Sequence, residues 1–291
     1  MSANSSDTHT SGLEGLIKLR LPRTSPAPKP TWDRAPILAH RPIGDRYHRL
    51  TLRAPTVSNA AEAGQFVMAT IGEGEVIVLP RPMAIHRRRP DRGEIDIVFS
   101  VTGRGTQALA NMSAGDYVDL IGPLGRGFEI ATGASRLLLI GRGIGVGAVM
   151  TAAEDARQRH VMVSAVLSAA RHESVIGLDD CAELGVAALP VADEDGSSTV
   201  EELETSLTRM HDETPPDIIM VCGSTRLVTL SVRLAKRWGA SVQVSVEEHM
   251  ACGLGYCHGC AAPVPTDPDR EGPMVCVDGP VFDACIQRVP A

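Results

Sequence analysis

Between residues 31 and 132 the chain consists of short runs in which apolar and polar residues alternate or apolar residues dominate, with Gly and Pro between the runs. Such runs predict β-strands, because successive side chains of a strand point to opposite faces of a sheet. Several short strands at this spacing predict a small antiparallel barrel, with one short helix at 106–112. The runs cover residues 48–55, 64–71, 75–82, 93–101 and 116–123.

After residue 133 the pattern changes to apolar strands that alternate with amphipathic helices. Residues 136–140 are a predicted buried strand, and a Gly-rich turn separates them from a predicted helix at 148–158. Strands and helices that alternate in this way predict a parallel sheet covered by helices. Further strands are expected at 161–169, 186–191 and 217–222, and further helices at 201–210 and 225–238.

Together these patterns predict a multidomain α+β chain. Ser, Thr and Pro are abundant in residues 1–30, which bury too little apolar surface to offset chain entropy and are expected to form a disordered tail. An antiparallel β-barrel is expected over 31–133 and an α/β domain over 134–240. A small Cys-rich subdomain is expected over 241–291.

The net charge of −7 over 291 residues gives the chain no general attraction for nucleic acid or for an anionic membrane. Arg87, Arg88, Arg89 and Arg92 are a local exception, for which a solvated loop is favoured over a functional patch. The sequence has neither an apolar run long enough to span a bilayer nor an export signal at its N-terminus. A cytoplasmic protein is therefore expected, in which cysteines are thiols or metal ligands rather than disulfides.

Four cysteines lie in one C-terminal segment, in the order C-x4-C-x2-C and then a fourth after a Pro-rich stretch. This is the local spacing of plant-type [2Fe–2S] ligands, and the glycines between the cysteines suit a backbone that wraps closely around a cluster. A structural zinc site usually has two C-x2-C pairs, whereas this segment has one, so zinc, disulfides and free thiols are the weaker alternatives. The predicted ligands are Cys252, Cys257, Cys260 and Cys276.

Gly141, Gly143 and Gly145 form a G-x-G-x-G turn between a predicted strand and a predicted helix. Free N–H groups and the helix dipole at such a turn could hold a phosphate or let a nucleotide pass close to the backbone. A tight connection without any ligand accounts equally well for the same residues. The motif alone is therefore weak evidence for a nucleotide site.

Two other segments carry phosphate-binding chemistry. Arg81 belongs to an Arg-Pro-Met sequence that closes a predicted barrel strand, and arginine can grip a phosphate with two parallel hydrogen bonds. Gly103, Gly105 and Thr106 offer N–H groups and a hydroxyl at a predicted helix start. Either segment could also be only a turn, since turns need the same residue types.

The motifs follow one another in a characteristic order. They are R-P-M at 81–83, G-R-G-T at 103–106, G-P-L-G-R-G-F at 122–128, G-R-G-I-G-V at 141–146, V-C-G at 221–223, E-E-H-M-A-C-G at 247–253 and V-D-G-P-V-F at 277–282. In this order the chain resembles the electron-transfer subunit of class 1B dihydroorotate dehydrogenase, a family of the ferredoxin-reductase superfamily. The resemblance covers about residues 32–291, and the Cys segment with its D-G-P-V-F tail is its most specific part.

The resemblance implies that the barrel binds FAD and that the α/β domain binds NAD. The residues implied to contact FAD are Arg81, Pro82, Met83, Gly103, Gly105 and Thr106. The residues implied to face NAD(H) are Gly141, Gly143, Gly145, Cys222 and Gly223. For Cys222, a place near the nicotinamide and a role as a buried thiol at a strand end are both open.

The resemblance also implies an oxidoreductase subunit with no catalytic acid or base. Electrons would pass from the FMN of a dihydroorotate dehydrogenase catalytic subunit through the [2Fe–2S] cluster and FAD to NAD+, within a heterotetramer that serves pyrimidine biosynthesis. One alternative is a reductase of the same build for ferredoxin, a sulfur compound or an oxygenase. Another is a regulator without enzyme activity, which binds a nucleotide and uses its cysteines for zinc or redox sensing.

Overall fold

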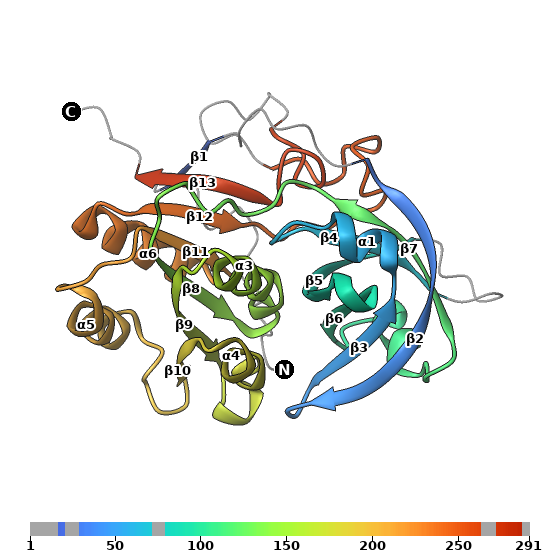
Figure 1. Cartoon of the computed structure of the whole chain (residues 1–291), viewed down its shortest axis with the longest axis horizontal. Coiled ribbons are helices and arrows are strands. Elements are labelled where there is room, and N and C mark those ends of the chain that lie inside the picture. The colour runs from blue at the N-terminus through green and yellow to red at the C-terminus, as the bar shows by residue number, and fades with distance from the viewer. Residues whose placement is uncertain (1–16, 21–28, 72–78, 263–271, 287–291) are drawn as a thin grey trace.

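The computed structural model describes residues 17–20, 29–71, 79–262 and 272–286. A closed barrel and an open sheet with helices on both faces lie side by side, and the described part of the cysteine segment lies along the top of the barrel (Figure 1). The predicted combination of an antiparallel barrel with an α/β body is confirmed. In the part of the chain that the structure describes, no helix is long and apolar enough to cross a membrane.

The barrel closes in the strand order β2-β3-β6-β5-β4-β7. Side chains such as Leu50 and Leu52 point inward and are fully buried, as the alternating pattern of the sequence requires. Helix α2 (Arg104–Ala110) corresponds to the expected helix, whereas the short helix α1 (Pro55–Ala60) was not predicted. The barrel strands are β2 (Thr31–Ile43), β3 (Tyr47–Arg53), β4 (Phe66–Thr70), β5 (Arg81–Arg89), β6 (Glu94–Ser100) and β7 (Tyr117–Leu124).

The open sheet has the strand order β1-β13-β12-β11-β8-β9-β10. The strands from β12 to β10 run parallel, as predicted, and β13 and β1 are antiparallel to their neighbours. The chain runs outward from β8 to β10 and then returns to the other side of β8, so the order reverses between β8 and β11. The strands are β1 (Ile17–Arg20), β8 (Arg136–Arg142), β9 (Met162–Ala169), β10 (Ala187–Ala192), β11 (Ile218–Cys222), β12 (Ser241–Ser245) and β13 (Val281–Ile286).

Helices cover both faces of the sheet. Helices α3 (Val146–Gln158) and α4 (Leu178–Leu184) pack on the face toward the barrel, where α3 also contacts β5. Helices α5 (Val200–His211) and α6 (Thr225–Trp238) pack on the opposite face (Figure 1). The first turn of α3 follows the predicted glycine turn directly, so this helix connects the glycine turn to the barrel.

Three predictions about chain segments are wrong. Ser241–Ser245 and Val281–Ile286 were expected in a separate Cys-rich subdomain, but they form β12 and β13 of the open sheet. Ile17–Arg20 were expected in a disordered tail, but they form β1 and pair with β13. Arg81 was expected to close a strand, yet it opens β5, which continues to Arg89. Part of the run expected at 75–82 lies outside the described residues.

The basic cluster is also not a solvated loop. Arg87 is 3% exposed within β5, and only Arg92 lies in an exposed turn. The charged sequence concealed a buried strand because acidic side chains of the α/β body neutralise its arginines.

Candidate functional site

The four predicted cluster ligands lie between β12 and β13 as two pairs. The side chain of Cys252 contacts that of Cys257, and the side chain of Cys260 contacts that of Cys276. The second pair is buried, whereas Cys257 is exposed. Two pairs of thiols suit a binuclear cluster, in which each iron takes two cysteine sulfurs. Over the described ranges, no group of three or more His, Cys, Asp or Glu side chains could hold one metal ion.

Backbone N–H groups of the loop are directed at the cysteine sulfurs. Leu254 and Cys257 donate to the Sγ atom of Cys252 over 3.3 and 3.4 Å, and Gly255 donates to the Sγ atom of Cys276 over 3.2 Å. Gly255 has a φ of 76°, a conformation that other residues rarely adopt, and this lets the loop turn its N–H inward. Donors of this kind orient cluster ligands and tune the potential of the bound cluster.

The surroundings of the cysteines also change their ionisation. Burial on its own would raise the pKa of Cys252, but the N–H groups of Leu254 and Cys257 outweigh it and hold the pKa at about 7. Burial, together with the Cys260 side chain, raises the pKa of Cys276 to about 12. Because iron binds thiolates, Cys252 is close to its binding form at neutral pH, whereas Cys276 needs the metal charge to ionise.

The cluster loop rests on the barrel. Gly253 lies so close to β4 that a Cβ atom there would collide with the side chain of Met68 and would come within 3.3 Å of Leu124 Cδ1. Met68 pairs with Pro82 in the register of β4 and β5. One strand therefore separates the loop from the Arg-Pro-Met motif.

The structure brings the Arg-Pro-Met motif and the start of α2 together. A Cβ atom on Gly105 would collide with the Arg81 guanidinium in its present position, so the guanidinium lies directly against the backbone of the turn. The Thr106 hydroxyl accepts hydrogen bonds from the backbone N–H groups of Thr102 and Gly103, over 2.9 and 3.1 Å. A guanidinium beside a glycine-rich turn supplies donors that fit a diphosphate.

Met83 has different surroundings from Arg81. Its side chain is 6% exposed and packs in the barrel core with residues such as Ile85 and Leu120. Any contact of Met83 with a ligand would therefore be made by its backbone.

The glycine turn at 141–145 lies beside the Cys222–Gly223 turn. A Cβ atom on Gly145 would lie 2.7 Å from the carbonyl oxygen of Cys222, and one on Gly223 would lie 2.8 Å from Cβ of Arg142. Both turns follow the carboxyl ends of β8 and β11, where the strand order reverses. In open α/β sheets this reversal is the usual place for a nucleotide.

Cys222 is a buried thiol at the end of β11. Its side chain is fully buried, and burial raises its pKa well above the usual range. Its Sγ–H group points at Oε1 of Glu247 over 3.8 Å. Because Glu247 begins the cysteine segment, this contact joins the Cys222–Gly223 turn to that segment.

The sequence did not single out several polar residues around the glycine turn. The Tyr47 hydroxyl would lie 3.2 Å from a Cβ atom on Gly143. Asp193 accepts from Arg142 over 2.5 Å and from Arg226 over 2.7 Å. Burial opposes ionisation of Asp193, but Arg142 and its other donors lower its pKa to about 2. Their position in the sequence could have indicated them, because Arg142 and Asp193 stand at the carboxyl ends of the predicted strands that form β8 and β10.

Residues 247–285 match the family model described as the iron-sulfur cluster binding domain of dihydroorotate dehydrogenase B. The dihydroorotate dehydrogenase B (NAD(+)) electron transfer subunit of Bacillus caldolyticus is 33% identical over 255 residues, which are 87% of this chain and 96% of that protein. The corresponding subunit of Geobacillus kaustophilus gives the same identity and coverage.

A solved structure of an NADH-dependent reduced ferredoxin–NADP oxidoreductase, studied for flavin-based electron bifurcation, matches with a TM-score of 0.72 and 26% identity. The match covers 86% of this chain and 88% of that chain. Phthalate dioxygenase reductase shares the fold, with a TM-score of 0.55 and 15% identity. The reductase and regulator alternatives are not favoured, because the relatives that match most of this chain are dihydroorotate dehydrogenase B electron transfer subunits. The chain belongs to the family of dihydroorotate dehydrogenase B electron transfer subunits.

Proposed function

We propose that this chain carries electrons between a dihydroorotate-oxidising catalytic subunit and NAD+, using a [2Fe–2S] cluster and FAD. The observation that carries this proposal is the direct packing of the cluster loop on Met68, one strand away from the predicted FAD motif. When bound, the cluster supplies single-electron exchange, FAD supplies the conversion between one and two electrons, and NAD+ supplies a two-electron acceptor.

In this proposal the cluster is held by the two cysteine pairs. Cys252 and Cys257 would ligate the iron nearer to solvent, and Cys260 and Cys276 would ligate the buried iron. The N–H groups of Leu254 and Gly255 would stabilise the negative charge on the sulfurs. The half-exposed loop leaves one side accessible to a partner subunit.

FAD would bind at the start of β5 and at the start of α2. Arg81 would pair with a phosphate oxygen, and the N–H groups of the glycine-rich turn would donate to the diphosphate. Thr106 would hold the turn in shape through its two accepted hydrogen bonds. The proposed FAD contacts are Arg81, Pro82, Met83, Gly103, Gly105 and Thr106.

NAD(H) would bind where the strand order of the sheet reverses. The glycine turn would let the dinucleotide pass close to the backbone, and the polar group of Arg142, Asp193 and Arg226 would border its path. Cys222 and Glu247 would close the inner end of the site. The proposed NAD(H) contacts are Gly141, Gly143, Gly145, Cys222 and Gly223.

The catalytic partner is proposed to be an FMN-containing dihydroorotate dehydrogenase subunit, in a heterotetramer that serves pyrimidine biosynthesis. The family membership of the chain supports this partner. A reducing cytoplasmic location suits the thiols that are required as cluster ligands. No side chain of this chain need act as an acid or base; the residues bind, orient and shield the cofactors.

A reconstitution experiment tests this function. The chain is purified anaerobically, alone and together with a dihydroorotate-oxidising subunit, and NADH formation from dihydroorotate and NAD+ is followed. The complex should form NADH, whereas neither subunit should do so alone. Equal activity of the catalytic subunit with and without this chain would contradict the proposal.

A further inference from the structure

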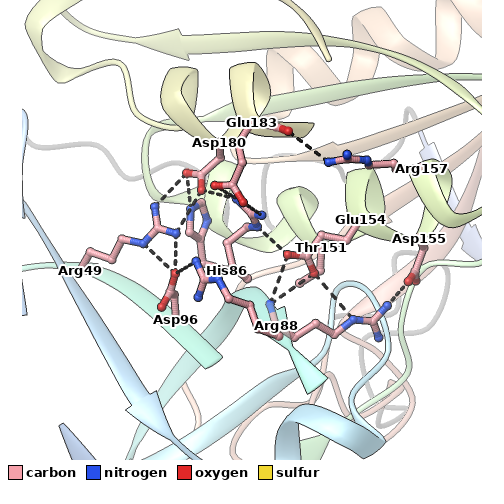
Figure 2. A network of polar contacts seen from close by, with 12 residues as sticks. Arg49, His86, Arg88, Asp96, Thr151, Glu154, Asp155, Arg157, Asp180 and Glu183 are labelled. Atoms are coloured by element: carbon pink, nitrogen blue, oxygen red, sulfur yellow. Dashed lines mark hydrogen bonds and ion pairs between the residues drawn. The ribbon is translucent and has the colours of Figure 1, made fainter. Parts of the chain in front are cut away.

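A largely buried network of ion pairs and hydrogen bonds joins the barrel to the α/β body (Figure 2). The barrel contributes arginines and a histidine from β3 and β5 and one aspartate from β6, and helices α3 and α4 contribute carboxylates. The members are Arg49, His86, Arg87, Arg88, Arg89, Asp96, Glu154, Asp155, Asp180 and Glu183. Neither the proposed cluster site nor the proposed nucleotide sites use these side chains.

Asp180 of α4 is the centre of this network. Its carboxylate accepts from both terminal nitrogens of Arg49 over 3.0 Å, from Nη1 of Arg87 over 2.6 Å and from Nε2 of His86 over 2.9 Å. Asp180 is 4% exposed. Burial opposes its ionisation, but His86 and Arg49 outweigh burial and hold its pKa far below the usual range. One carboxylate thus holds three side chains of the barrel.

Arg87 makes the reciprocal connection from β5. Its guanidinium donates to Glu154 of α3 over 2.5 Å, to Asp180 over 2.6 Å and to Glu183 over 3.1 Å. The neighbouring Arg88 adds a backbone hydrogen bond to Glu154, over 3.2 Å. Strand β5 is therefore held against both α3 and α4. Because several hydrogen bonds act at once, they fix the orientation of the strand as well as its distance from the helices.

Strand β5 and helix α3 also adjoin the proposed cofactor contacts. Strand β5 begins with the Arg-Pro-Met motif, and α3 begins immediately after the glycine turn. The His86 ring faces the first turn of α3, where a Cβ atom on Gly147 would lie 3.9 Å from Nδ1. A shift of β5 against α3 would therefore move the Arg-Pro-Met motif relative to the glycine turn.

Hydride transfer is sensitive to such a shift, because the reacting atoms must approach to about 3–3.5 Å and a misplacement of about 1 Å can cost about a hundredfold in rate. Domains joined by ordinary polar interfaces move relative to each other by default. We propose that Asp180 and Arg87 are positioning residues, which fix β5 against α4 and α3 and thereby set the geometry between the nicotinamide and the flavin. This inference rests on the proposed function.

The test compares two variants of one helix in the protein loaded with FAD and cluster. Asp180→Asn and Glu183→Gln both convert a carboxylate that binds Arg87 into an amide, but the Glu183 side chain is 62% exposed. Anaerobic stopped-flow mixing with NADH gives the limiting rate of FAD reduction and the charge-transfer absorbance of the nicotinamide–flavin pair. Hydrogen exchange over residues 81–89 and 146–158 reports directly on the seam, which is the contact of β5 with α3.

For Asp180→Asn we expect a limiting rate at least about tenfold lower, together with weaker charge-transfer absorbance and faster exchange at the seam, at unchanged FAD content. Glu183→Gln should stay within about twofold of the wild-type rate, because its ion pair is exposed to solvent. A folded, FAD-loaded Asp180→Asn protein with the wild-type rate would overturn the inference, as would an equal slowing in Glu183→Gln.

A milder variant decides the question if Asp180→Asn does not fold. Arg87→Lys keeps the positive charge but loses the planar fork that reaches three carboxylates at once. A lower limiting rate with retained FAD supports the inference, and an unchanged rate overturns it. Failure of the wild-type protein itself to reduce FAD with NADH would instead contradict the proposed function.

Discussion

The barrel meets the rest of the chain at two seams of opposite chemistry. At the cluster seam, Met68 of β4 and Leu124 of β7 lie against Gly253 of the cysteine loop. At the charged seam, arginines of β5 are buried against carboxylates of α3 and α4. Electron transfer between the proposed cluster and the proposed FAD needs closeness, which this packing provides. Hydride transfer also needs a fixed direction of approach, and this is the role proposed for the charged seam.

The largest effect is expected at the cluster itself. Cys257→Ser removes one of four ligands, so iron should be lost and partner-coupled NADH formation should fall at least about a hundredfold, because electrons then have no route to FAD. FAD content and NADH oxidation with an artificial dye should be kept. Iron analysis and the two activity assays check this.

A thiol outside the quartet provides the control for Cys257→Ser. Cys181 is buried in the α/β body, and Cys181→Ala should keep its iron. Full partner-coupled activity in Cys257→Ser would show that the cluster assignment is wrong.

The charged seam should dominate the stability of the domain arrangement. Asp180→Asn leaves buried guanidiniums without their carboxylate, and we expect a loss of about 3–5 kcal/mol in the free energy of unfolding. Glu183→Gln should cost less than about 1 kcal/mol, because the Glu183 side chain is mostly exposed. Denaturant unfolding of both variants measures the difference, and equal losses would remove the distinction between buried and exposed pairs.

The contribution of Asp180 should also depend on pH. Its folded pKa is lowered from the usual 3.8, so its stabilisation is present above that pH and is lost as the pH falls below it. The difference in unfolding free energy between the wild type and Asp180→Asn should therefore be constant from pH 7 to about 5 and should shrink below about pH 4. A difference that grows on acidification would contradict this sign.

A smaller effect is expected from the proposed FAD site. Arg81→Ala removes a charge-assisted hydrogen bond worth about 1.5–3 kcal/mol, so the dissociation constant for FAD should rise about 10- to 100-fold. The cluster should remain bound, because Arg81 does not belong to the cysteine loop. Flavin released on gel filtration measures the effect, and unchanged flavin retention would exclude a phosphate contact for Arg81.

The smallest effect is a change in nucleotide preference. Asp193 neutralises Arg142 and Arg226 at the carboxyl edge of the sheet, so Asp193→Asn leaves two guanidiniums that can donate hydrogen bonds to a 2′-phosphate. The ratio of kcat/KM for NADPH to that for NADH, measured by dye reduction, should rise about tenfold. An unchanged ratio would place the adenosine ribose away from Asp193.

The two seams also differ in how far they could be predicted. The cysteine loop is encoded locally, because ligand spacing and glycines occur within one segment, and its four cysteines do assemble in pairs. The charged seam joins β5 to helices that follow much later in the chain. Read alone, its arginines at 87–89 indicate a solvated loop, and no local pattern shows that Glu154 and Asp180 will neutralise them. The same limit concealed the pairing of Asp193 with Arg226.

The most direct test is an anaerobic titration of the isolated chain with NADH, combined with analysis of iron, acid-labile sulfide and FAD. Two irons, two sulfides and one FAD per chain are expected, and NADH should reduce the cluster, which electron paramagnetic resonance can follow. Protein that binds FAD but contains no iron or sulfide, or whose cluster NADH cannot reduce, would contradict the proposed function.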